Sequence, residues 1–460
     1  MITLIILSGL GILTLFAQIL RFRKGLFPVI LVGLAAAFYF TSADYNSNPQ
    51  PWFSSMLDFN HYAIAFSRSI IIIAFLWFMM ARNYFLQETS ATDHFALVIF
   101  SLVGAVSMVS YNNLTMLFLG IEILSLSAYV LAASDKGNIL SNEAGFKYFL
   151  MGSFATGFLL FGITLIYGVS GSFDLHTIQQ SIATHQQPGM VLIGILLLLV
   201  GLCFKASLVP FHFWAPDVYD GAPTPVTAYM ATVVKTAAFG AFFRLFYICF
   251  PDMISQWANV LWWIVVLTLF IANITAVRQN SVKRMLAYSS IAHAGYLAIA
   301  IVSMNPANGD AGRAILYYTL TYSISTITAF TVLYMVARNS GREDFGAFEG
   351  LAKTNPFLSF VMVVAMLSLA GIPPTAGFFG KYYIFQNAIA THNTGLVLLA
   401  VIAALIGVFY YFRVIIAVYF KPKQSSIPIT VGGLHRTVLF ITTLLTILLG
   451  LFPDLILQWI

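Results

Sequence analysis

The chain of 460 residues is 60% hydrophobic and only 8% charged, with a mean hydropathy of +0.89. Soluble domains carry about 25% charged residues, so this composition excludes a soluble globular protein and indicates a polytopic membrane protein. The formal net charge of +6 lies largely in short loops between apolar segments, where it sets topology, so it does not indicate nucleic-acid binding.

Apolar segments long enough to cross a membrane follow one another along the whole chain. A span needs roughly 20 apolar residues, and on that measure we predict an all-α polytopic membrane protein with about fourteen transmembrane helices. The first apolar run is followed, not preceded, by basic residues, so we expect it to be retained rather than cleaved as a signal peptide. The predicted spans are 2–20, 26–41, 60–81, 94–110, 112–132, 142–169, 189–209, 226–249, 257–277, 282–303, 311–337, 356–391, 395–420 and 435–457.

The basic residues alternate between connections. Lys and Arg gather after odd-numbered spans, from residues 21–24 to residues 421–436, and are nearly absent after even-numbered ones. Because basic loops stay in the cytoplasm, the pattern places both termini on the outer side. The connection 170–188 has no Lys or Arg, which suits an external segment, and we expect a short amphipathic piece there.

One predicted span is broken next to ionisable residues. In 204–226, FKASLVPFHFWAPDVYDGAPTPV, Lys205 ends a long apolar run, and Pro210 and His212 follow it. Backbone groups freed by a break cost several kcal/mol in lipid unless protein or water satisfies them. An ionisable side chain at that depth also costs about 3 kcal/mol. A chain that carries both costs at one place is expected to use that place for ion or proton movement.

A second break occurs in 366–385, MLSLAGIPPTAGFFGKYYIF, where Pro373 and Pro374 interrupt the apolar run and Lys381 follows. Paired interrupted helices are typical of inverted-repeat transporters with sites near the midplane. We therefore predict two five-helix repeats, each with one broken helix, and match Lys381 with Lys205. The expected domains are 1–93 (the first three spans), 94–249 (first repeat), 257–420 (second repeat) and 421–460 (last span).

Glu122 is an isolated carboxylate in LFLGIEILSLSAYVL, and it is either a buried structural ion pair or a protonatable site. Either interpretation needs a cationic partner, because an unpaired buried carboxylate would become neutral. We expect Lys147 or Lys205 in that position. Glu143 precedes Lys147 by one helical turn, so these two residues are also a candidate pair.

Lys205 and Lys235 could be lysines that extend their side chains to the membrane surface. However, Lys205 precedes a broken half-helix, and Lys235 stands in the middle of a span. Burial favours the neutral form of a lysine, so a buried lysine can release its proton, whereas an arginine effectively never does. Arg68, Arg244 and Arg413 are therefore expected to be structural or interfacial.

His293 could be an ordinary core histidine, but Ser289, Ser290 and Tyr296 share its predicted helix. With TYSISTIT in the next span, these hydroxyls could hold water and relay protons. No second histidine or carboxylate has ligand spacing to His293, so a metal site is not expected. The candidate row is Glu122, Lys147 or Lys205, Lys235, His293 and Lys381, in which protonation of one member affects the next.

No cofactor motif accompanies this row. Cys203 and Cys249 are far apart in apolar surroundings and form neither a disulfide framework nor a CxxC pattern. No glycine-rich phosphate loop opens a βαβ unit. We expect the chain to bind no flavin, nicotinamide, iron–sulfur cluster or metal of its own.

Three stretches together resemble the antiporter-like membrane subunits of the energy-converting NADH:quinone oxidoreductase, respiratory complex I. They are the two broken segments and SVKRMLAYSSIAHAGY at 281–296. Among the three homologous subunit types of this family, the length and Lys381 favour type N. Type M typically has a glutamate at that position, and type L extends beyond the fourteenth span.

By this resemblance Glu122 is the glutamate of the fifth span, Lys205 its lysine partner, Lys235 the central lysine and Lys381 the terminal lysine of a proton channel. Lys147 and His293 also match family positions. The resemblance implies a subunit that supplies translocation only, in a bacterial inner membrane beside other complex I membrane subunits. NADH, FMN, iron–sulfur clusters and quinone would be used by other parts of the complex.

Three other functions remain open from the residues, and the least favoured is a stand-alone solute transporter, because no substrate-specific polar cluster is visible beyond the row. The chain could belong to a multi-subunit sodium/proton antiporter or a membrane-bound hydrogenase, which share this core. It could also be a structural membrane subunit that no longer conducts, although Glu122 and the three buried lysines argue against that interpretation.

Overall fold

The structure, a computed structural model, describes residues 1–17, 19, 23–46, 56–85, 91–184, 188–305, 307, 309–422 and 428–459. Helices form nearly all of this part, and its extended pairings are isolated bridges. The helices are α1 (Ile2–Phe16), α2 (Arg23–Asn46), α3 (His61–Phe85), α4 (Ala91–Ser110), α5 (Leu114–Ala132), α6 (Ile139–Ser170), α7 (Leu175–Thr184), α8 (Pro188–Ala206), α9 (Trp214–Gly221), α10 (Thr224–Tyr229), the π-helical turn η1 (Met230–Val234), α11 (Lys235–Cys249), the 3₁₀ turn η2 (Pro251–Met253), α12 (Ile254–Val277), α13 (Val282–Val302), α14 (Asp310–Ser340), the 3₁₀ turn η3 (Phe345–Phe348), α15 (Leu351–Thr354), α16 (Pro356–Ala370), α17 (Ala376–Ala390), α18 (Thr394–Phe420), α19 (Gly433–Leu451) and α20 (Asp454–Leu457).

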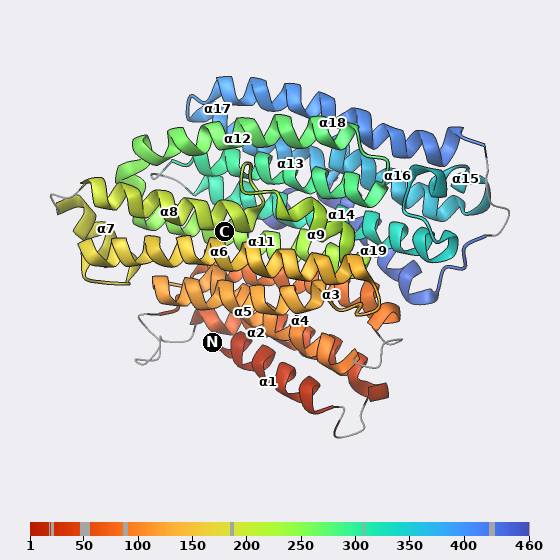
Figure 1. The fold of residues 1–460 in the computed structure, drawn as a ribbon, viewed down its shortest axis with the longest axis horizontal. Coiled ribbons are helices and arrows are strands. Elements are labelled where there is room, and N and C mark those ends of the chain that lie inside the picture. Colours follow the sequence, from red (N-terminus) through yellow and green to blue (C-terminus); the bar gives the residue numbers. More distant parts are fainter. Residues whose placement is uncertain are drawn as a thin grey trace.

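The long helices run side by side as one bundle (Figure 1). Among the described residues, twelve helices are long and apolar enough to cross a membrane, and the shorter apolar helices α1 and α16 accompany them. The prediction of an all-α polytopic membrane protein is confirmed, while the count of fourteen spans stays a prediction. Parts of the predicted basic connections, residues 20–22 and 423–427, lie outside the described residues.

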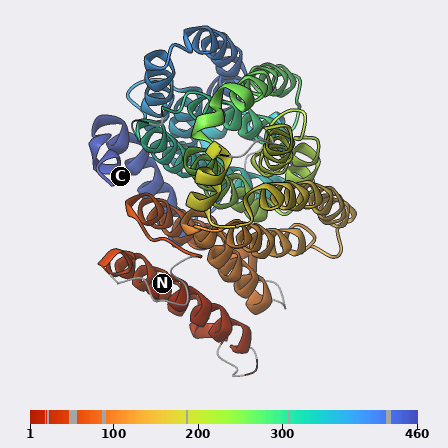
Figure 2. The same cartoon turned by 90° about the vertical axis from the view of Figure 1, so that its left-hand side faces the viewer.

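The bundle has a clear centre and edge. In the most apolar 18-residue stretch of α13 and of α14, 94% is buried inside the protein, whereas the share in α2 is 33%. Figure 2, which looks along the helices, shows α1 and α2 at one edge. The short amphipathic piece expected in 170–188 is α7, which buries Leu175 and Ile178, while its place on the outer side stays a prediction. The central helices α13 and α14 are also those that carry His293 and the hydroxyl-rich segment 321–328.

The first predicted break lies between α8 and α9. After Ala206 the backbone turns left-handed at Ser207 (φ 64°), and the Leu208 N–H donates to Cys203 O at 2.8 Å. This contact satisfies a carbonyl that the ended helix would otherwise leave free. Across the break, Trp214 Nε1 donates to Phe204 O at 3.0 Å, so the second half-helix is fastened to the end of the first.

The second break, between α16 and α17, is built in the same way. Gly371 is left-handed (φ 83°), and the Ile372 N–H donates to Leu367 O at 3.0 Å. The half-helices then approach closely, because a Cβ on Gly377 would lie only 1.9 Å from Ser368 O. Glycine at position 377 therefore allows the two halves of the broken helix to pack together.

A π-helical turn interrupts the helix that carries Lys235. Residues 224–249 run as α10, η1 and α11, and η1 ends at Val234, directly before Lys235. Such turns insert an extra residue and often occur at functional sites. The turn changes the direction in which the Lys235 side chain leaves the helix. Both the turn and Lys235 are buried inside the bundle.

We predict that Gly377→Ala destabilises the second break by about 1–3 kcal/mol, because the added methyl group forces the half-helices apart. The measurement is thermal unfolding of the purified protein in detergent. Gly395→Ala on α18 is the matched control, since a Cβ there meets nothing within 4 Å. Equal thermal stability of the two variants would contradict the close approach at Gly377.

Candidate functional site

Lys205 lies in the last turn of α8, at the mouth of the first break, and is 6% exposed. Its Nζ donates to Ser125 Oγ of α5 at 2.7 Å and lies 5.8 Å from the centre of the Tyr148 ring. The ammonium is therefore held by a neutral hydroxyl and an aromatic face.

Glu122 does not form the expected ion pair in the described part of the chain. Its Oε1 accepts a hydrogen bond from Thr156 Oγ1 of α6 at 2.8 Å, and its side chain is only partly buried. Lys205 is bound instead to Ser125, one turn further along the same helix as Glu122. Glu122 and Lys205 therefore bind different hydroxyl groups and do not pair with each other in the part of the chain that the structure describes.

Lys147 lies apart from the buried row, contrary to the prediction. Its Nζ pairs with Glu143 at 2.6 Å, as the spacing indicated, and with Asp217 of α9 at 2.8 Å, and its side chain is 38% exposed. Roughly 13 Å of helix separates Lys147 from Thr156, the residue of α6 that reaches Glu122. Lys147 therefore belongs to an ion-pair cluster at the end of the bundle.

Lys235 is the most enclosed member of the row, with 2% of the residue exposed. Its Nζ donates to Ser290 Oγ at 2.6 Å and to Ser290 O at 2.5 Å, so α13 supplies both acceptors. No carboxylate of the described residues lies within ion-pair distance of this ammonium. Ser290, which the sequence placed beside His293, is thus a direct partner of Lys235.

His293 is enclosed by tyrosines. Its Nδ1 is joined to the Tyr318 hydroxyl at 2.7 Å and its Nε2 to the Tyr411 hydroxyl at 3.0 Å. Ser289 also hydrogen-bonds the Tyr411 hydroxyl, and the Tyr322 ring centre lies 4.7 Å from that of His293. Both ring nitrogens therefore contact groups that can donate or accept a proton.

Lys381 reaches back across the second break from α17. Its Nζ donates to Ala370 O at 2.8 Å and Leu369 O at 3.2 Å, the last carbonyls of α16, and lies 4.8 Å from the centre of the Tyr296 ring. The expected match with Lys205 is wrong in position, because Lys205 ends the half-helix before its break and Lys381 follows its break. The Lys381 ammonium binds the C-terminal end of the first half-helix, whereas the Lys205 ammonium donates to Ser125 of α5.

Lys381 also borders a cavity of about 450 Å³ between the second break, α17 and α18. Partly polar side chains such as Tyr382 and Gln386 line it together with apolar ones. The cavity gives Lys381 an approach to the outer surface of this chain.

His212 is the other ionisable residue near a break. It is buried, and its ring packs against that of Phe213.

The three arginines of the spans are structural, as expected. Arg244 donates to Tyr111 O at 2.7 Å and pairs with Asp58 at 3.2 Å, and Arg413 donates to Val277 O at 2.6 Å at the end of α12. Arg68 donates to Thr41 Oγ1 at 3.0 Å. Arg68 and Arg413 join neighbouring helices, Arg244 joins α11 to the segments before α3 and after α4, and none of the three contacts the lysine row among the described residues.

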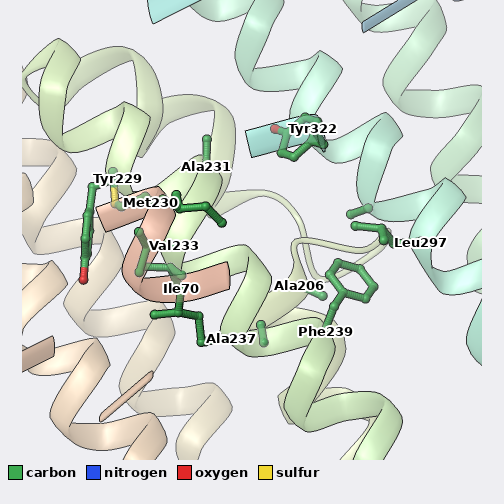
Figure 3. Packing of buried hydrophobic residues seen from close by; sticks show 14 of the residues in the cluster. Ile70, Ala206, Tyr229, Met230, Ala231, Val233, Ala237, Phe239, Leu297 and Tyr322 are labelled. Carbon is green, nitrogen blue, oxygen red and sulfur yellow. The ribbon is translucent and has the colours of Figure 1, made fainter. Parts of the chain in front are cut away.

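The sequence singled out Ser289 and Ser290 but did not identify Ser125, Thr156 and Tyr411 as neutral partners of the row. Ser125 lies one turn after Glu122, so the helical period contained a signal for it. Tyr411 of α18 and Thr156 of α6 reach His293 and Glu122 from distant helices, and only the tertiary structure brings them there. Buried apolar side chains, among them Ala206, Phe239 and Leu297, pack in the core of the bundle (Figure 3).

The short helix α9 is held by charged contacts to α13. Arg284 pairs with Asp217 at 2.9 Å and with Asp220 at 3.2 Å, and Lys283 Nζ donates to Ala222 O at 2.9 Å. Because α9 has only eight residues, tertiary contacts must supply most of its stability. The cluster therefore fixes the second half of the first broken helix against the helix that carries Ser290 and His293.

Known proteins resemble the chain over its full length. The family described as NADH:quinone oxidoreductase/Mrp antiporter, TM matches residues 111–407. NADH-quinone oxidoreductase subunit N of Cytophaga hutchinsonii is 41% identical over 99% of this chain and 98% of its own. A chain of respiratory complex I from Thermus thermophilus with bound aureothin is 33% identical, with a TM-score of 0.84 over 99% of this chain and 98% of that one. A chain of the archaeal membrane-bound sulfane sulfur reductase is 26% identical, with a TM-score of 0.88 over 99% and 96%.

We predict that Arg284→Gln lowers the stability of the purified protein by about 1 kcal/mol, since two partly exposed ion pairs to α9 are lost. Thermal unfolding measures the effect. Arg313→Gln, which removes an exposed pair with Asp310 on one helix, is the control and should change little. If both variants unfold at the wild-type temperature, the cluster does not hold α9.

Proposed function

The chain belongs to the family of membrane subunits that NADH:quinone oxidoreductase shares with Mrp antiporters, and on that premise we propose the route by which it moves protons. It is the subunit N type of NADH-quinone oxidoreductase, a translocase, and a multi-pass protein of the bacterial inner membrane. It works as one of several complex I membrane subunits. The proposed route runs through Glu122, Lys205, Lys235, His293 and Lys381.

The observation that carries the route is the surroundings of Lys235. Its ammonium is buried in the middle of a helix and is held only by the hydroxyl and carbonyl of Ser290 among the described residues. A buried cation without a carboxylate partner loses its proton more easily than one in an ion pair. Lys235 can therefore be charged in one state of the protein and neutral in another.

The neighbours of Lys235 extend the route in both directions. Towards one side lies Lys205, which donates to Ser125, one helical turn after Glu122. Towards the other side lies His293, which shares α13 with Ser290, the partner of Lys235, and with Tyr296, whose ring lies under the Lys381 ammonium. In such a row each change of charge alters the proton affinity of the next group, which passes a displacement along the membrane plane.

Lys147 and Glu143, which the resemblance placed in or beside the route, are assigned a supporting role at its border. Lys147 is paired with two carboxylates and is partly exposed. An ammonium stabilised in this way is a poor proton donor. We propose that the Lys147–Asp217 pair instead sets the electrostatic potential near the first break.

Glu122 indicates where a neighbouring subunit binds. The carboxylate is only partly buried, and the exposed apolar side chains Leu119, Ile123 and Leu126 surround it on α5. A carboxylate open to lipid is costly, so this face is expected to be covered by protein. We propose that another membrane subunit of the complex covers it and completes the surroundings of Glu122.

The redox chemistry of the complex is assigned to other subunits. NADH, FMN, iron–sulfur clusters and quinone are proposed to act outside this chain, because a cluster is usually held by four cysteines and the chain has two. The two also lie on separate helices, Cys203 on α8 and Cys249 on α11. The contribution of this chain is then proton translocation driven from elsewhere.

We also propose the division into repeats at 94–249 and 257–420, flanked by 1–93 and 421–460, with both termini on the outer side. The shared construction of the two breaks supports it, as do two isolated bridges at comparable places, Asn113 with Asp174 and Ser281 with Asp344. Each bridge joins the cap of one helix to the segment after the next long helix. Related antiporter and reductase complexes use the same fold, so the fold alone does not select the partner.

We predict that Lys205→Arg abolishes most NADH-driven proton pumping by the assembled complex. The substitution keeps the positive charge but removes easy proton release, because arginine stays protonated. Proton uptake into vesicles containing the purified complex measures the effect, and the subunit content of the complex serves as the assembly control. Wild-type pumping in this variant would mean that Lys205 is only an electrostatic anchor.

A second prediction concerns the partner of Lys205. Ser125→Ala removes the acceptor of the ammonium and should reduce the pumping rate several-fold, because the charged form of Lys205 loses a hydrogen bond of about 1.5–3 kcal/mol. Ser127→Ala is the matched control on the same helix, since Ser127 Oγ donates only to Ile123 O. Equal rates in the two variants would remove Ser125 from the route.

A further inference from the structure

His293 is held by hydroxyl groups on both sides of its ring. Tyr318 of α14 contacts Nδ1 at 2.7 Å, and Tyr411 of α18 contacts Nε2 at 3.0 Å. The Tyr411 hydroxyl also bonds Ser289 Oγ, about one helical turn before His293 on α13. Four groups on three helices therefore form one continuous hydrogen-bonded chain, which we call the hydroxyl–imidazole chain: Ser289, Tyr411, His293 and Tyr318.

The hydroxyl–imidazole chain is buried and its members are neutral groups. Each of the four is at most 3% exposed. In the part of the protein that the structure describes, the ring nitrogens of His293 bind tyrosine hydroxyls and no carboxylate. The Lys381 ammonium lies over Tyr296, whose ring centre is 6.0 Å from that of His293. A buried positive charge without a carboxylate, close to a second positive charge, is unfavourable, so the site favours the neutral ring.

The contacts of His293 suit both neutral forms of the ring. A neutral imidazole has one N–H and one acceptor nitrogen, and the proton can occupy either nitrogen. In one form Nδ1–H donates to Tyr318 and the Tyr411 hydroxyl donates to Nε2. In the other form Tyr318 donates to Nδ1 and Nε2–H donates to Tyr411. Because a tyrosine hydroxyl can donate or accept, both contacts remain hydrogen bonds in either tautomer, and no helix has to move.

We propose that Tyr411 and Tyr318 are the proton-transfer partners of His293, which changes tautomer and not net charge. The proposal deepens the function proposed above and rests on it. A hydronium ion of the route gives one proton to Ser289, Ser289 passes its own to Tyr411, and Tyr411 passes its own to Nε2. The ring releases its Nδ1 proton to Tyr318, which gives its own hydroxyl proton to a water molecule. One proton enters and one leaves, every member ends neutral, and passage in the other direction restores the first tautomer.

The two ends of the hydroxyl–imidazole chain lie beside elements of the neighbouring lysine sites. Ser289 directly precedes Ser290, which accepts from the Lys235 ammonium at 2.6 Å. At the other end, the Tyr318 ring packs against Gly380, directly before the buried lysine of α17, and a Cβ on Gly380 would lie 2.6 Å from Tyr318 Cδ2. The chain therefore extends from the helix that holds one lysine to the helix that carries the next.

The test compares Tyr411→Phe, Tyr318→Phe and the double variant in the assembled complex, reconstituted in vesicles. Each substitution keeps the ring and removes one hydroxyl. We expect each single variant to lower NADH-driven proton pumping by about tenfold or more, since a positioned proton-transfer group contributes at least that much. Because every transfer uses both hydroxyls, the double variant should pump no more slowly than the slower single variant. Two independent structural losses would instead multiply.

Tyr317→Phe is the matched control. Tyr317 precedes Tyr318 on α14 and is fully buried, and its hydroxyl donates to Leu449 O at 2.6 Å. This variant should pump at nearly the wild-type rate.

The comparison also separates a change of tautomer from a change of charge. If His293 took up and returned a proton on one side of its ring, one of the two tyrosines would be dispensable. A normal pumping rate in either single variant, or multiplied losses in the double variant, overturns the proposal. If Tyr411→Phe does not assemble, Ser289→Ala opens the same side of the chain with a smaller change and should give the same loss. A normal rate in that variant then overturns the proposal.

Lys235→Met distinguishes failure of this inference from failure of the function on which it rests. If Lys235→Met stops pumping and Tyr411→Phe does not, the route stands and the hydroxyl–imidazole chain is wrong. If Lys235→Met pumps normally, the proposed route fails and the chain fails with it. Loss of pumping in both, with a normal Tyr317→Phe control, is the result expected here.

Discussion

An ammonium group inside a membrane protein must find acceptors within the protein, and here two interrupted helices carry lysines whose acceptors are neutral groups. Lys205, on the last turn of α8, donates to the Ser125 hydroxyl, and Lys381 binds the last carbonyls of α16 from the other side of the break. The Lys381 site therefore uses the partial negative charge of a helix C-terminus. The breaks would be a defect in an ordinary span. In this bundle they let a lysine remain charged far from water.

The kind of acceptor separates lysines that can release a proton from those that cannot. Lys147 is bound by two carboxylates, and Arg244 by a carboxylate and a carbonyl, so their charge is permanent in this structure. Lys235 has only the groups of one serine among the described residues. Neutral acceptors favour the cation less than a carboxylate does, so the neutral amine remains within reach. The same residue type therefore has two roles, which the surroundings decide.

Sequence reasoning located the breaks and the buried lysines, because prolines and charges stand out in apolar runs. It could not assign their partners. Glu122 was expected to meet a lysine, but the rotation of α5 and α6 brings Thr156 to it instead. Lys381 was matched to Lys205 by its distance from a break, although it lies on the opposite half-helix. Such contacts depend on how helices turn against one another, which one sequence read segment by segment does not contain.

The row works only if its members influence one another strongly enough. Two unit charges roughly 10 Å apart interact by about 1.7 kcal/mol at an effective dielectric constant near 20, which is more than a tenfold change in proton affinity. Helix α13 keeps the members close, since Arg284, Ser290 and His293 are successive contacts of one buried helix with α9, α11 and α18. A charge change at Lys205 therefore need not move a helix to be felt at Lys235. It needs only a proton path between them, and the first hydroxyl that Lys205 meets is that of Ser125.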